Sequence, residues 1–158
     1  MLTAILIATL LAPPAAQPQP SALLHERYTL DNGLEVVLHE DHRIPFIAVR
    51  LVYHVGTMHD PPGKEGLTHL LEHAMFGGSA HVADGEHYEK LLRAGASGVG
   101  AFTTQSSTVY HADIPANRLP LVLWLESDRM GTFNARTHRG TIEKERRIVV
   151  EEMAQRRR

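Results

Sequence analysis

The first part of the chain has the alternating and apolar patterns of β-strands. Residues 26–41 predict a β-hairpin, because two strand-like runs flank Asp31, Asn32 and Gly33, and an Asn-Gly pair favours the positive φ angles of a tight turn. Residues 46–56, with the sequence FIAVRLVYHVG, are rich in β-branched and aromatic side chains, which favours a buried strand. The pattern therefore predicts three successive strands.

A turn and two helices are predicted next. Residues 58–66 contain the run Pro-Pro-Gly, which neither a helix nor a strand accommodates, so they predict a turn. Residues 66–78, with the sequence GLTHLLEHAMFGG, carry leucines at helical spacing. Residues 84–95 predict a second helix, with Asp84 as its N-cap and Gly95 as its end.

The second half of the chain predicts two further strands and two further helices. Residues 100–114 contain two strand segments rich in Thr and Val, and residues 115–131 predict a helix that starts near a proline. The middle of this helix, residues 121–125, is apolar on all sides and is expected to be buried on several of them. Residues 137–158 predict a charged final helix. Because the strands cluster, the expected fold class is α+β, with an antiparallel or mixed sheet and helices packed on one face.

The N-terminus has a different composition from the rest of the chain. Leu2–Ala12 is an unbroken apolar run, and a proline-rich stretch follows it. The run is too short to span a bilayer as a helix, but it suits a signal peptide with small residues near its cleavage site at Ala15 and Ala16. We therefore expect residues 1–22 to be a signal peptide and linker, residues 23–158 to form the domain, and the protein to be exported, periplasmic or secreted. A buried N-terminal helix is the alternative interpretation.

Composition narrows the chemistry that the chain can perform. The length of 158 residues is enough for one domain with a sizeable core. A formal net charge of −2 gives no indication of a nucleic-acid partner. There is no cysteine, which excludes disulfides and thiolate metal sites. A zinc site in this chain would have to use histidine and carboxylate ligands, and the chain has 11 histidines.

Two histidines and a glutamate interrupt the apolar helix of residues 66–78. Burying His69, Glu72 and His73 beside leucines costs free energy unless these groups find polar or metal partners. His69 and His73 lie one turn apart on the same helical face, where both imidazoles can bind one metal ion. Glu72 lies one residue off that line and can take a proton from a metal-activated water without being a ligand. A pair of ordinary surface histidines is the alternative, so a third ligand decides between the two.

The final predicted helix offers this third ligand. At helical spacing, Ile142, Glu145, Val149 and Glu152 share one face, which is partly apolar. Glu151 points about 100° away from Glu152 and belongs to a fully charged face. A carboxylate on a core-facing stripe needs a cation or a hydrogen-bond donor, and zinc held by the two histidines would satisfy Glu152. The alternative is an amphipathic helix whose charged groups extend over the edge of the core.

These residues resemble the insulinase/pitrilysin family of zinc metallopeptidases, the inverzincins, which carry an inverted His-x-x-Glu-His motif. The family-like segments, in family order, are LDNGLEVVL, VGTMHDPPGKEGLTHLLEHAMFGGS, GAFTTQSSTVYHADIP, LWLESDRM and EKERRIVVEEM. The resemblance implies one zinc ion per chain, held by His69, His73 and Glu152. It implies Glu72 as the general base.

The resemblance also implies residues that support the metal site and bind substrate. Glu145 corresponds to a supporting glutamate of the family, which orients a histidine ring. A strand edge around Gly100, Ala101, Phe102 and Thr103 is expected to bind an extended peptide. The family commonly has asparagine at the position of Gly100, so this chain lacks one side chain that contacts the substrate backbone.

The expected function is that of a zinc-dependent endopeptidase, which hydrolyses peptides or small proteins with a zinc-activated water. Family modules usually continue past the third ligand and occur in pairs, so residues 23–158 would be the N-terminal part of one module. A second family module or a partner chain is therefore expected. The alternative is a non-catalytic or truncated family member that acts as a zinc-binding structural or partner subunit. Two histidines and a glutamate would also bind cobalt or manganese.

Overall fold

The computed structural model describes residues 24–135 and 139–156, so the expected signal peptide lies outside the described part. The chain divides into two compact units, Met1–His42 and Arg43–Arg158. In the first unit, β1 (Glu26–Thr29) pairs antiparallel with β2 (Glu35–Leu38). Gly33 has a φ of 86° in the connecting turn. The predicted hairpin and its turn glycine are therefore confirmed.

The second unit is built on a three-stranded antiparallel sheet with the order β3-β5-β4. Its strands are β3 (Phe46–Tyr53), β4 (Ser97–Thr103) and β5 (Thr108–Pro115). The central strand, β5, buries every second side chain. Residues on β3 instead alternate between exposed and half-buried, and Val52 is 47% exposed. The strand predicted over residues 46–56 is present as β3, but its predicted burial was wrong, because β3 is an edge strand whose side chains are at most half-buried.

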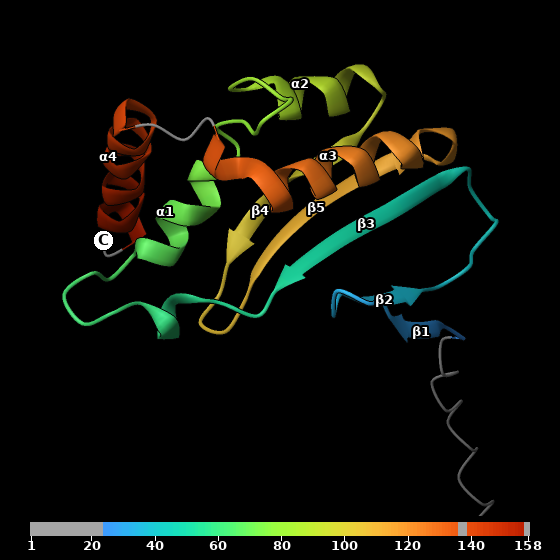
Figure 1. The fold of residues 1–158 in the computed structure, drawn as a ribbon, viewed down its shortest axis with the longest axis horizontal. Helices are drawn as coiled ribbons and strands as arrows, with labels where there is room; N and C mark the ends of the chain where they lie inside the picture. The colour runs from blue at the N-terminus through green and yellow to red at the C-terminus, as the bar shows by residue number, and fades with distance from the viewer. Residues whose placement is uncertain (1–23, 136–138, 157–158) are drawn as a thin grey trace, which may run out of the picture. The chain divides into compact units, whose positions relative to one another are not determined.

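Helices cover one face of this sheet (Figure 1). The structure has α1 (Leu67–Ala74), α2 (Glu86–Arg93), α3 (Leu119–Thr132) and α4 (Arg139–Arg156), in the order that the sequence predicts. Figure 1 shows α4 beside α1, and the two helices pack against each other. The expected α+β class with helices on one face of an antiparallel sheet is confirmed. No helix of the described residues is long and apolar enough to cross a membrane.

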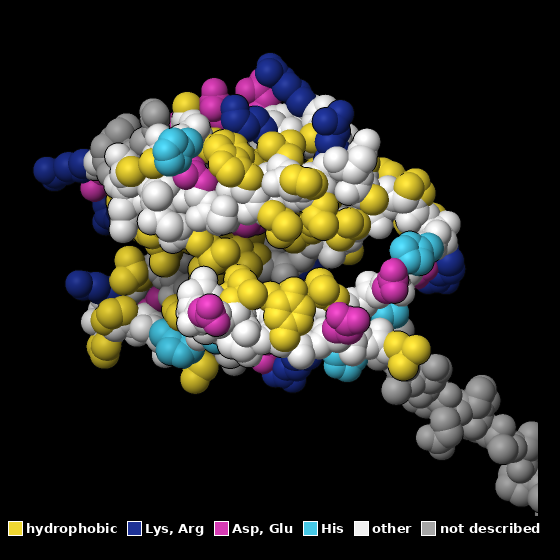
Figure 2. Space-filling view, turned by 45° about the vertical axis from the view of Figure 1, so that its right-hand side comes forward, with side chains coloured by type: hydrophobic (Ala, Val, Ile, Leu, Met, Phe, Trp, Pro, Cys, Tyr) yellow, Lys and Arg dark blue, Asp and Glu magenta, His cyan; other side chains and the backbone are white. Residues whose placement is uncertain are grey.

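The core lies between the sheet and the helices. Its buried residues, drawn from the sheet, α2, α3 and the loops between them, are Val82, Leu91, Ala96, Ala112, Ile114, Val122 and Leu125. On α3, Leu123 and Trp124 are 55% and 44% exposed, so the expected burial of residues 121–125 on several sides was wrong. Figure 2 shows hydrophobic side chains gathered on the surface around α3.

The structure confirms the predicted C-terminal end of α2 and corrects the predicted N-cap. Gly85, with a φ of 76°, is the N-cap residue in place of Asp84, the expected cap. Gly95 follows the C-cap with a φ of 87°, as the prediction required. A glycine at both ends allows the chain to reverse direction sharply before and after the helix.

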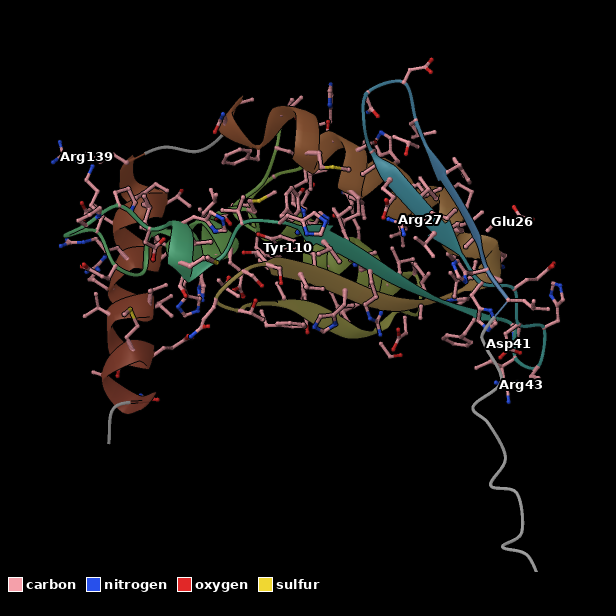
Figure 3. The ribbon with its side chains drawn as sticks, turned by 90° about the horizontal axis from the view of Figure 1, so that it is seen from below. Glu26, Arg27, Asp41, Arg43, Tyr110 and Arg139 are labelled. Atoms are coloured by element: carbon pink, nitrogen blue, oxygen red, sulfur yellow. The ribbon has the colours of Figure 1, made fainter. Side chains whose placement is uncertain are left out.

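A buried arginine links α3 to the centre of the sheet. Arg129 is 1% exposed, and its Nη2 lies 2.5 Å from Glu126 Oε2. The guanidinium carbon lies 4.0 Å from the centroid of the Tyr110 ring and 5.2 Å from that of Phe76. Tyr110 projects from β5 inside the unit (Figure 3). Burial raises the pKa of the Tyr110 hydroxyl, which Arg129 partly offsets, so this ring stays a neutral hydrogen-bond donor.

Candidate metal centre

The helix α1 brings His69, Glu72 and His73 together. His69 and Glu72 are each 7% exposed, and His73 is half-buried. One ligand atom from each residue lies within 4.8 Å of the others. The two imidazole rings stand nearly perpendicular, with centroids 4.9 Å apart. Donor atoms this close together can reach a single metal ion.

The helix α4 places a carboxylate opposite these rings. Glu152 Oε2 lies 3.4 Å from His69 Nε2 and 3.8 Å from His73 Nε2. The face of α4 that carries Glu152 also carries buried Val149, whereas Glu151 is exposed. The burial of α4 thus follows the helical spacing, and the structure brings the three sequence-predicted ligands together.

Glu145 lies behind His73. Its Oε2 lies 3.2 Å from His73 Nδ1. A carboxylate oxygen only accepts hydrogen bonds, so His73 Nδ1 carries the proton and donates it. This tautomer leaves the lone pair of His73 Nε2 on the side that faces Glu152. Glu145 is therefore placed to orient the ring of His73, as carboxylates behind metal-binding histidines do in metal sites.

The separations between Glu152 and the two histidines suit a zinc ion. Tetrahedral zinc with ligands at about 2.0–2.2 Å keeps its donor atoms roughly 3.3–3.6 Å apart. The distances from Glu152 Oε2 to His69 Nε2 and His73 Nε2 are 3.4 Å and 3.8 Å, close to this value. Two neutral imidazoles and one carboxylate are a donor set that zinc accepts, with a fourth position left for water or substrate.

Glu72 is attached to the sheet. The Thr103 hydroxyl donates a hydrogen bond to Glu72 Oε2 at 2.5 Å. The Tyr110 hydroxyl donates to the backbone carbonyl of Glu72 at 3.2 Å. The first contact holds a carboxylate oxygen of Glu72, and the second holds its backbone. Sequence reasoning named Thr103 only as a substrate-binding residue and did not name Tyr110. It missed both contacts with Glu72, because the two hydroxyls lie 31 and 38 residues away on other elements.

The four residues expected to bind substrate all lie on β4. In the described sheet β4 pairs only with β5, so its other edge is unpaired there. Successive side chains point to opposite faces of a sheet. Thr103 lies on the face that the helices cover and reaches Glu72, whereas the neighbouring Phe102 is 49% exposed. A Cβ added to Gly100 would lie 3.2 Å from the His111 ring. Glycine at this position therefore leaves room for His111, and the binding role of the four residues stays a prediction.

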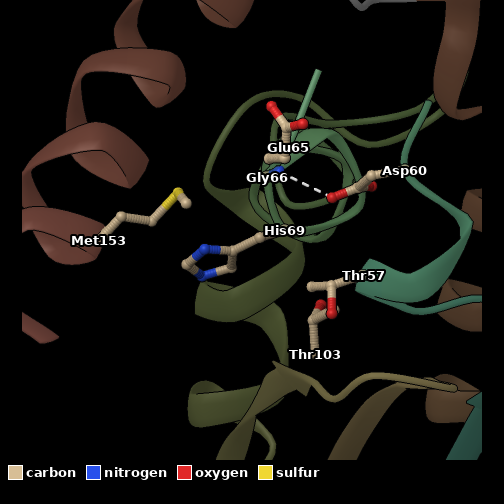
Figure 4. A pocket seen from close by; sticks show the side chains of 7 residues that line it. All are labelled: Thr57, Asp60, Glu65, Gly66, His69, Thr103 and Met153. Atoms are coloured by element: carbon tan, nitrogen blue, oxygen red, sulfur yellow. Dashed lines mark hydrogen bonds between the residues drawn. The ribbon is translucent and has the colours of Figure 1, made fainter. Parts of the chain in front are cut away.

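A cavity of about 370 Å³ adjoins His69, one of the candidate ligands (Figure 4). Its lining comes from the segment before α1, from α1, β4 and α4: Thr57, Asp60, Glu65, Gly66, His69, Thr103 and Met153. Burial raises the pKa of Asp60, but hydrogen bonds from Thr68 and Gly66 outweigh it and hold that pKa below its ordinary value. The cavity is therefore open to His69 and carries negative charge.

Known proteins of similar sequence and structure include zinc proteases. A zinc protease of Helicobacter pylori, PqqE, is 31% identical over 129 residues, which are 81% of this chain and 28% of that protein. The human insulin-degrading enzyme is 32% identical over 104 residues, 66% of this chain and 10% of that protein. The crystal structure of a protease from Helicobacter pylori superposes with a TM-score of 0.76 and 32% identity, covering 82% of this chain and 30% of that chain.

The chain thus spans between about a tenth and a third of the length of these relatives. The sequence model of the family described as insulinase, peptidase family M16, matches residues 35–157, which include the residues of both α1 and α4. The chain belongs to the insulinase family of peptidases, M16.

Proposed function

We propose that this chain carries the catalytic metal site of a zinc-dependent endopeptidase that acts on peptides or small proteins. The observation that carries the proposal is the convergence of His69 and His73 on α1 with Glu152 on α4, within 3.4 and 3.8 Å. Zinc proteases and an insulin-degrading enzyme among the relatives support it. Localisation in an exported or periplasmic compartment, inferred from the N-terminal apolar run, is part of the same proposal.

The residues of the chain take separate parts in the proposed reaction. His69, His73 and Glu152 would hold a zinc ion, which would supply a Lewis acid to acidify water and polarise the scissile carbonyl. Glu72 accepts a proton from the attacking water at Oε1 and passes it to the leaving amine. The Thr103 hydroxyl holds Glu72 Oε2, so the carboxylate does not rotate away during proton transfer.

The edge of β4 supplies the substrate position in this proposal. An extended peptide can pair with the unpaired edge of a sheet through main-chain hydrogen bonds. Thr103, at the end of β4, already contacts Glu72, so a peptide paired along Gly100, Ala101 and Phe102 would pass beside the general base. A second family module or a partner chain would enclose this peptide, since the chain spans only part of its relatives.

Peptide cleavage by the Glu72→Gln variant tests the assignment of the general base. The variant should keep zinc binding, because Glu72 is not one of the proposed ligands, and should lose cleavage of a quenched fluorescent peptide by about 10²-fold or more. The test uses the chain together with any co-purifying module. Cleavage at the wild-type rate by a fully zinc-loaded variant would contradict the proposed mechanism. A wild-type chain that binds zinc but cleaves no peptide would favour the alternative, a non-catalytic structural or partner subunit. That alternative is supported by the small part of each relative's length that the chain spans.

A further inference from the structure

The first turn of α1 is capped by a residue outside the helix. The N-cap residue is Gly66, with a φ of 92° and no side chain to accept a hydrogen bond. Asp60 replaces it: Gly66 N–H donates to Asp60 Oδ2 at 2.7 Å (Figure 4). Thr68 donates to Asp60 Oδ1 twice, from its N–H at 2.8 Å and from its hydroxyl at 2.5 Å. One carboxylate therefore satisfies two backbone donors that a helix start leaves without partners.

Charge strengthens this cap. The hydrogen bonds that Asp60 accepts outweigh the effect of its burial and lower its pKa, so the carboxylate is ionised at neutral pH. An anion at the N-terminus of a helix also interacts favourably with the helix dipole. Asp60 thus holds the first turn of α1 by hydrogen bonds and by charge together.

The segment that carries this carboxylate is anchored to the sheet. In the short 3₁₀ helix Thr57–His59, Thr57 N–H donates to the Thr104 carbonyl at 3.0 Å and Met58 N–H to the Gln105 carbonyl at 2.9 Å. A Cβ added to Gly56 would lie 2.5 Å from backbone atoms of Thr104 and Gln105. Only glycine allows so close an approach, so the segment is packed directly against the β4–β5 turn.

These contacts attach α1 to the end of β4 at two points. Thr103 holds Glu72 on the second turn of α1, and the β4–β5 turn that follows holds the Asp60 segment against the first turn. We propose that Asp60 is a positioning residue of the metal centre, which fixes the first turn of α1 so that His69 faces Glu152. The proposal rests on the metal site of the proposed function. His69 directly follows Thr68, so a shift of this turn displaces its imidazole first.

Metal binding by Asp60 variants of the full chain tests this role. Asp60→Ala should weaken zinc binding by about tenfold, the lower end of the effect of removing a group that orients a ligand. It should also change the visible spectrum of bound cobalt, which reports ligand geometry. Asp60→Asn keeps one acceptor oxygen and should fall between Asp60→Ala and the wild type. Asp84→Ala is the matched control, because Asp84 is exposed and also precedes a helix, and it should change neither quantity.

Circular dichroism separates a positioning role from a loss of fold. A folded Asp60→Ala variant with the zinc affinity and cobalt spectrum of the wild type would overturn the proposal. If Asp60→Ala does not fold, Thr68→Val takes its place, since it removes only the hydroxyl contacts to Asp60 and Gly56. It should weaken zinc binding in the same direction, and an unchanged affinity would overturn the proposal. Failure of the wild type to bind zinc would instead contradict the proposed function.

Discussion

Replacement of Arg129 by methionine tests how the interior of the second unit supports α1, the helix that carries His69 and His73. The substitution keeps most of the side-chain length and removes the cation. Arg129 has 2% side-chain exposure, and its partner Glu126 has 12%. The change therefore leaves a nearly buried carboxylate without its cation. It also removes the guanidinium from the ring of Tyr110, whose hydroxyl donates to the Glu72 carbonyl.

The expected loss in the free energy of unfolding is about 3–5 kcal/mol. Removing one partner of a buried ion pair typically costs this much, because the other charge stays buried without compensation. The contact with the Tyr110 ring adds to the loss, since cation–π contacts contribute about 0.5–2 kcal/mol. The double variant Arg129→Met with Glu126→Gln should regain a part of the loss, because it removes the orphaned charge.

Urea unfolding followed by circular dichroism measures the change. Arg93→Met is a matched control, because Arg93 Nη2 lies 2.5 Å from Glu89 Oε1, the same separation as in the buried pair. That control pair is exposed and should cost about 1 kcal/mol or less. Equal losses for Arg129→Met and Arg93→Met would refute the argument from burial.

Three further predictions concern the metal centre, the base and the interior. Glu145→Ala should weaken zinc binding about 10–100-fold in a competition titration, because His73 loses the carboxylate that orients it; unchanged affinity would remove Glu145 from the site. Thr103→Val should lower peptide cleavage about tenfold without changing zinc content, since Glu72 loses a hydrogen-bond donor; an unchanged rate would show that this donor is dispensable. Burial, and to a smaller extent the charge of Arg129, lower the pKa of His87 from 6.5 to about 3 in the folded chain. As the pH drops from 6.5 toward 3, His87 therefore becomes protonated in the unfolded chain but not in the folded one, and the free energy of unfolding falls. The slope should be up to about 1.4 kcal/mol per pH unit in urea unfolding, and a His87→Leu variant with the wild-type slope would contradict it.

Local patterns predicted the parts of the fold that depend on neighbouring residues. The hairpin turn at Gly33 and the end of α2 at Gly95 follow from backbone conformations that glycine adopts easily. The face of α4 that carries Glu145 and Glu152 follows from helical spacing. These features need no knowledge of what lies across the fold.

Contacts between distant elements could not be predicted in this way. Leu123 and Trp124 belong to an apolar run, yet both side chains are exposed. Which side of α3 is buried depends on how the helix packs against the sheet, and the run itself does not reveal this. The attachment of Glu72 to Thr103 depends on the distance between α1 and β4, which no local pattern encodes. Asp60 was part of a predicted turn, and its capping role appears only when α1 is in place.

The most direct test of the account is zinc bound per chain, measured by atomic emission in the wild type, Glu152→Ala and Glu151→Ala. The two variants differ by one position on α4, but only Glu152 lies near His69 and His73, while Glu151 is exposed. We expect one zinc per chain in the wild type and in Glu151→Ala, and a large loss in Glu152→Ala. A folded wild type without zinc, or equal zinc in the two variants, would contradict the three-ligand site.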